Sequence, residues 1–111
     1  ERLVFCSKHC LQKLQARIEK WCDDSFGQYR ISTSIIHNLK PEIDKLNKDL
    51  KSLHQGVYSY DNEIALKILR EKKDKILNGF AECFMLLFDA AAREQINIQM
   101  LYDTIDKKIN T

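Results

Sequence analysis

The chain has 111 residues, of which 44% are hydrophobic and 31% are charged, and its formal net charge is +2. This length and hydrophobic content suit a single domain with an ordinary core, and three glycines and one proline are too few turn residues for an all-β or α/β fold. Acidic and basic residues alternate along nearly every segment, as on a solvated surface, and unlike a nucleic-acid footprint or a polybasic membrane tail. The sequence therefore predicts an all-α protein.

The first predicted helix covers about Arg2 to Phe26. Its apolar residues recur at helical spacing and include Val4, Leu11, Leu14, Ile18 and Trp21. Gly27 follows the last periodic residue. Glycine commonly lies just past a helix end, because it adopts the left-handed backbone conformation without a Cβ penalty. We therefore predict that this helix ends at Phe26.

The second predicted helix covers about Ser32 to Gln55, with Gly56 as its stop. Its apolar residues step by three and four and form the most regular heptad seam in the chain: Ile36, Leu39, Ile43, Leu46, Leu50 and Leu53. Pro41 lies inside this helix. Proline cannot donate to the carbonyl of His37 and its ring crowds that turn, so we predict a kink at Pro41 rather than two separate helices.

Two more helices are predicted at about Asp61 to Leu77 and Phe80 to Ile109, separated by a stop at Asn78-Gly79. The last helix would be longer than its neighbours, so its end projects or it bends between Arg93 and Asn97. As a third possibility, Gly79 lies inside one continuous helix, at a cost of about 1 kcal/mol relative to alanine. Such a long rod would require a dimer.

These elements predict one domain, residues 1–111, folded as an antiparallel four-helix bundle with the second helix kinked at Pro41. The alternative is a three-helix chain with a long C-terminal helix that forms a dimer.

The segment from Phe80 to Ala92 is apolar except for Glu82 and Asp89. These two carboxylates are seven residues apart, so a helix places them on one line, which we interpret as its exposed edge. The segment is shorter than the roughly 20 residues that a membrane span requires, and we predict no transmembrane segment. Its remaining faces must be covered by the other helices or by a partner.

Cys6, His9 and Cys10 share one helical face and are residue types that bind zinc. A structural zinc site needs four ligands, and the usual Cys-x-x-Cys pairs are absent, so we favour small core residues over a metal site. Cys22 or Cys10 could form a disulfide with Cys83. We favour reduced, buried cysteines because the core is large enough without cross-links.

No pattern in the sequence predicts catalysis or a cofactor. The chain has no Glu-x-x-His pair, no His-Glu-x-x-His motif and no glycine-rich phosphate loop, so we predict a protein that is not an enzyme and binds no cofactor. The basic run from Lys67 to Lys75 contains Glu71 and Asp74 and has no interleaved aromatic residue, which argues against nucleic-acid binding.

The sequence favours a non-enzymatic interaction or oligomerisation module of a larger intracellular, cytoplasmic protein. Such a scaffold or coiled-coil module would offer an apolar helical face to a partner helix or to its own copy. The predicted contact residues are Phe84, Leu87, Phe88, Leu101 and Tyr102. The alternative is a secreted four-helix signalling protein with one or two disulfides.

Overall fold

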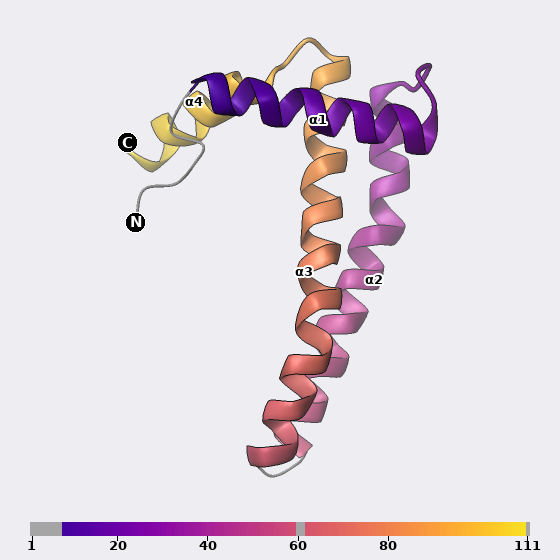
Figure 1. Ribbon diagram of the computed structural model, residues 1–111, viewed down its shortest axis with the longest axis vertical. Coiled ribbons are helices and arrows are strands. Elements are labelled where there is room, and N and C mark those ends of the chain that lie inside the picture. The colour runs from indigo at the N-terminus through magenta and orange to yellow at the C-terminus, as the bar shows by residue number, and fades with distance from the viewer. Residues whose placement is uncertain (1–7, 60–61, 111) are drawn as a thin grey trace. The chain divides into compact units, whose positions relative to one another are not determined.

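The computed structural model describes residues 8–59 and 62–110, and the regular secondary structure in these two ranges is entirely helical (Figure 1). Four helices follow one another, α1 (Lys8–Phe26), α2 (Ser32–Ser59), α3 (Asn62–Arg93) and α4 (Ile98–Ile109). The predicted all-α class with four helices is therefore confirmed. None of the helices within the described ranges is long and apolar enough to cross a membrane.

The C-terminus of α1 lies where the sequence predicts it. Gly27 has a φ of 88°, and its N–H donates to the carbonyl of Asp23 at 2.9 Å. This is a left-handed helix cap of the kind that favours glycine. The start predicted at Arg2 lies outside the described residues.

Helix α2 is continuous through Pro41, where the sequence predicts a kink, and through Gly56, where it predicts a stop. Pro41 lies within the helix, and the kink predicted there stays a prediction. The stop predicted at Gly56 is wrong, because α2 continues to Ser59. A glycine inside a helix costs only about 1 kcal/mol relative to alanine, so it does not by itself end one.

Helix α3 is continuous through Gly79, and the break predicted at Asn78-Gly79 is wrong. A Cβ at residue 79 would lie 3.1 Å from Cδ1 of Leu46 on α2. The absence of a side chain at Gly79 therefore lets the α3 backbone approach α2 closely, and this glycine does not end the helix. The long helix through Gly79 was one of the predicted possibilities.

The predicted helix from Phe80 to Ile109 is also wrong, because α3 ends at Arg93 and α4 begins at Ile98. The N–H of Ile96 donates to the carbonyl of Ala91 at 3.0 Å, and that of Gln95 donates to Ala92 at 3.1 Å. Gln95 has a φ of 64° and takes the position that glycine usually occupies in this type of cap. The interruption falls in the segment for which the sequence predicts a bend.

Helices α2 and α3 form an antiparallel hairpin (Figure 1). Lys72 donates to the hydroxyl of Ser52 at 2.7 Å, and Nζ of Lys75 lies 3.3 Å from Oδ1 of Asp49. Residue numbers thus rise along α3 as they fall along α2, which fixes opposite directions for these two helices. Antiparallel packing of all four helices stays a prediction.

Contacts within the chain divide it into two units. The hairpin unit contains His37–Phe84, and the terminal unit combines the residues up to Ile36 with those from Met85 onward. In the terminal unit, α1 fixes the start of α4, since the Ile98 N–H donates to Oε1 of Gln15 at 2.8 Å. The side chain of Asn97 caps α4 by accepting from the Met100 N–H at 2.9 Å.

Candidate functional site

Asp89 on α3 is the most deeply buried charged residue in the described part of the chain, with 0% of its surface exposed. The interpretation of Asp89 as an exposed edge residue is therefore wrong. An isolated carboxylate is very costly to remove from water, so a buried one requires a cation and hydrogen bonds.

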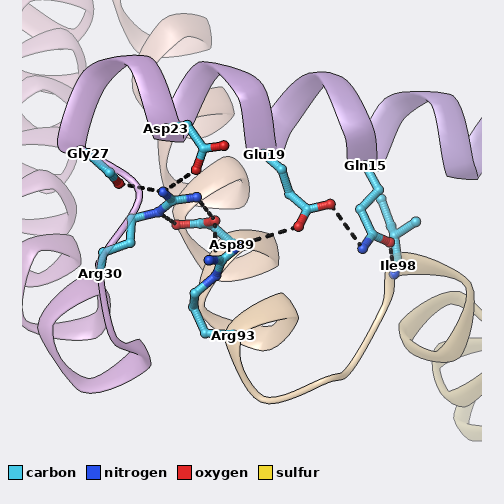
Figure 2. A network of polar contacts seen from close by, with 8 residues as sticks. All are labelled: Gln15, Glu19, Asp23, Gly27, Arg30, Asp89, Arg93 and Ile98. Carbon is cyan, nitrogen blue, oxygen red and sulfur yellow. Dashed lines mark hydrogen bonds and ion pairs between the residues drawn. The ribbon is translucent and has the colours of Figure 1, made fainter.

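Arg30 supplies that cation from the linker between α1 and α2. Its Nε donates to Oδ2 of Asp89 at 2.6 Å, and its Nη2 donates to Oδ1 at 2.7 Å (Figure 2). The Arg30 side chain is itself only 5% exposed. The two parallel bonds form the bidentate pairing that a planar guanidinium makes with a carboxylate.

The third nitrogen of the Arg30 guanidinium ties the linker to the end of α1. Nη1 donates to Oδ1 of Asp23 at 2.5 Å and to the carbonyl of Gly27 at 2.6 Å. A cation is favourable at this helix C-terminus, where carbonyls lack partners within the helix. The hydrogen bonds to Asp89 raise the pKa of Arg30 above its ordinary value, so the guanidinium remains charged.

A second arginine extends the cluster along α1. Arg93 donates from Nη2 to Oε1 of Glu19 at 3.2 Å, and its Nε lies 4.0 Å from Oδ1 of Asp89 (Figure 2). That distance is too long for a hydrogen bond, and Arg93 Nε has no hydrogen-bond partner among the described residues. Arg93 is therefore held more loosely than Arg30. We call Glu19, Asp23, Arg30, Asp89 and Arg93 the ion-pair cluster.

The geometry of the ion-pair cluster is suited to holding helices together. Each carboxylate in it contacts an arginine, and the Asp89–Arg30 pair is closed to solvent. A general base needs an accessible lone pair, and Asp89 does not offer one. We therefore interpret the ion-pair cluster as a clamp between the linker, α1 and α3.

Cys22 is a buried thiol beside this clamp. Burial and, to a smaller extent, the neighbouring Asp89 carboxylate raise the pKa of Cys22 to about 11, and the Arg30 guanidinium offsets only part of that rise. Burial also raises the pKa of Cys83. A thiol held in its protonated form is a poor nucleophile, so neither group has the environment of a reactive cysteine.

The raised pKa of Cys22 predicts a specific pH dependence of stability. Above pH 9 the thiol of the unfolded chain loses its proton while the folded chain keeps it up to about pH 11. The unfolded state then binds fewer protons, so the free energy of unfolding falls across this range. Urea unfolding at several pH values should show a steeper fall for the wild type than for Cys22→Ala, in which the other titrating groups are retained. Equal slopes would contradict the assignment.

An open pocket of about 440 Å³ lies between α1 and α4. Most of its polar lining consists of carboxamides, and its lining residues are Gln12, Gln15, Ala16, Glu19, Asn97, Ile98, Gln99 and Met100. Carboxamides do not titrate, and Glu19 is already paired with Arg93. Glu19 is therefore the one carboxylate in the lining of this pocket, and Arg93 holds it in an ion pair.

The five predicted contact residues lie on two helices. Phe84, Leu87 and Tyr102 are exposed, whereas Phe88 and Leu101 are half-buried. Phe84 belongs to the hairpin unit, and the other four belong to the terminal unit. They therefore do not form one patch within a single unit.

The zinc and disulfide candidates divide between described and undescribed residues. Cys6 lies outside the described residues, His9 is exposed and Cys10 is half-buried. Within the described ranges, no three His, Cys, Asp or Glu side chains are grouped as a metal site would require. Cys10, Cys22 and Cys83 are free cysteines, so no disulfide joins any two of these three.

One set of exposed apolar residues extends along the hairpin unit. Its members are each between 40% and 62% exposed, and they are Ile43 on α2 with Leu66, Leu69, Leu77, Phe80 and Phe84 on α3. We call these six residues the hairpin face. Only Phe84 among them was a predicted contact residue, because the helical spacing of Ile43, Leu69 and Leu77 predicted that these side chains face the core.

Comparison with known proteins gives no match, because no family model fits the chain and no curated protein or solved structure is significantly similar to it.

Proposed function

We propose that this chain is a non-enzymatic protein–protein interaction or oligomerisation module of a larger intracellular protein. The observation that supports the proposal is the hairpin face, six large apolar side chains exposed on one two-helix unit. Several large apolar side chains exposed on one unit are typical of a surface that binds another protein.

The composition of the hairpin unit supports the same proposal. Its buried apolar residues, within the described range, are Leu39, Leu46, Ala65, Ile76 and Cys83. Only three of these five are large aliphatic side chains, fewer than the six on the hairpin face. Leu50, Leu53 and Ile68 are half-buried, so the two helices bury few large side chains completely, and they gain stability when a further layer covers their exposed side.

The free state of Cys10, Cys22 and Cys83 is consistent with a reducing intracellular compartment. Phe84 is a proposed contact residue as part of the hairpin face. Leu87, Phe88, Leu101 and Tyr102 are further proposed contacts, which single alanine substitutions would test. No observation on the described residues favours the secreted alternative.

The double variant Leu69→Glu/Phe84→Glu tests the proposal. We expect the wild-type chain, in reductant, either to self-associate in native mass spectrometry or to bind the dye anilinonaphthalene sulfonate as a folded monomer. The double variant should lose whichever property the wild type shows and keep its helical circular dichroism, because both side chains are exposed. A wild-type monomer that binds no dye would contradict the proposal.

A further inference from the structure

We propose that the occupant of the hairpin face is the hairpin face of a second copy of this chain, so that two hairpin units form an intermolecular four-helix bundle. This inference is based on the proposed function and specifies its partner. It follows from the distribution of apolar residues over the two sides of the hairpin, from the exposed area and from the pairing that a two-fold axis would give.

The two helices of the hairpin expose their apolar residues on the same side. On α3, Leu66 and Leu77 each directly follow a buried residue, Ala65 and Ile76. On α2, Leu39 and Leu46 are buried, and Ile43 follows Leu39 by four residues. Its side chain is therefore turned about the α2 axis away from the buried line, in the same direction in which Leu66 and Leu77 are turned on α3. When two right-handed helices pack antiparallel, side chains that are turned in the same direction from the line of contact lie on the same side of the pair. The six residues therefore lie on one side of the hairpin, five of them along α3, while Ile43 on α2 is flanked there by the exposed polar residues Lys40 and Asn47.

The opposite side of the hairpin is mostly polar. Its exposed polar residues are Asn38, Lys45 and Ser52 on α2 and Lys67, Glu71, Lys75 and Asn78 on α3. Ile64 is the apolar exception on that side. A helical layer with one apolar side and one polar side packs its apolar side against a second layer, as in a four-helix bundle.

The exposed area is close to what a stable dimer buries. A half-exposed leucine, isoleucine or phenylalanine leaves about 100 Å² accessible, so the six residues expose about 600 Å² per copy, against roughly 800 Å² per partner in standard interfaces. Polar side chains between and beside the six, such as Lys73 and Asn47, supply the remainder. A second hairpin of the same length covers the face from end to end.

A two-fold axis near Leu77 makes the face self-complementary. The positions on α3 are spaced so that, in an antiparallel pair, Leu69 of one copy lies opposite Phe84 of the other. Lys73, which interrupts the apolar series, then lies opposite Phe80, where a lysine ammonium can interact with an aromatic ring. In an isologous pairing both copies use the same surface, so the assembly stops at a dimer.

The test compares substitutions at two neighbouring residues on opposite sides of the hairpin, Leu77→Glu and Asn78→Glu. Sedimentation equilibrium of the full chain in reductant should show a wild-type dimer. Leu77→Glu should raise the dissociation constant by at least about a hundredfold, because an unpaired charge is buried twice at the interface. Asn78→Glu should leave it unchanged, since that residue lies on the polar side.

A third variant tests the same pairing by strengthening the dimer, so that its result does not depend on a substitution that could unfold the chain. Lys73→Leu exchanges the contact between Lys73 and Phe80 for a buried leucine, and because the apolar burial outweighs the cation–π attraction, the variant should tighten the dimer by about tenfold. Circular dichroism checks that each variant keeps the wild-type helix content. If Leu77→Glu is unfolded, an unchanged dissociation constant for Lys73→Leu overturns the inference on its own.

The remaining outcomes separate this inference from the proposed function. A dimer that Leu77→Glu leaves intact uses another surface and overturns the hairpin pairing. A wild-type monomer at all concentrations also overturns the pairing. If that monomer binds anilinonaphthalene sulfonate and Leu77→Glu abolishes the binding, the face is open to a different protein and the proposed function stands. If it binds no dye, both proposals fail.

Discussion

Asp89→Ala is expected to lower the free energy of unfolding by about 3 to 5 kcal/mol, which is the usual cost of removing one partner from a buried ion pair. The substitution leaves the Arg30 guanidinium at a site that is 5% exposed, without the two bonds that Asp89 accepts. Urea unfolding followed by circular dichroism measures the loss. A change below about 1 kcal/mol would show that the pair is not buried in solution.

Two controls separate the buried charge from the rest of the ion-pair cluster. The double variant Arg30→Met/Asp89→Leu removes both charges together and should recover most of the lost stability, because it leaves no buried guanidinium without the two bonds that Asp89 accepts. Asp24→Ala removes one partner of the Lys20–Asp24 pair on α1, whose side chains are 79% and 67% exposed. That pair is solvated, and its loss should have little effect on the urea midpoint.

Leu86→Ala is expected to cost about 2 to 5 kcal/mol, whereas Leu87→Ala at the next position should cost far less. Both residues lie on α3, but Leu86 is 4% exposed and Leu87 is 44% exposed. Removing the Leu86 side chain leaves a cavity among residues that can relax only in part. Urea midpoints of the two variants, measured side by side, give the comparison.

The same pair of positions tests the contact predicted at Leu87. Leu87→Asp should retain the helical fold, because the new carboxylate remains in contact with water, while Leu86→Asp should unfold the chain. If Leu87→Asp also unfolds, Leu87 contributes to the core in solution and its assignment as a contact residue is wrong.

The helical class and the end of α1 could be predicted because their causes are local. Apolar spacing indicates helices, and Gly27 marks a cap in which only nearby backbone groups take part. The end of α3 could not be found in this way. Its cap uses Gln95 with a positive φ where glycine is usual, while Gly79, which looks like a stop, serves the approach to Leu46.

The clamp on Asp89 was missed for a different reason. The spacing of Glu82 and Asp89 places both on one helical line, but periodicity does not show which part of that line is covered. The cover comes from Arg30, which is 59 residues away in the chain and is the only charged residue between Gly27 and Ile31. A carboxylate within an apolar run and one charge in a short linker are the two signals that, taken together, would have suggested the pair.

The division of the chain into two units has a consequence for the order of folding. The terminal unit is joined by contacts between residues far apart in sequence: Arg30 with Asp89, Glu19 with Arg93, and Gln15 with Ile98 are separated by 59, 74 and 83 residues. Closing such long loops in a disordered chain is entropically costly, and contacts of this kind form late. The hairpin unit has only a short connection between its helices, so it can form first and shorten the loop that the Arg30–Asp89 pair must close. Slow steps in folding are therefore expected to involve docking of α1 and α4, with the α2–α3 hairpin already in place.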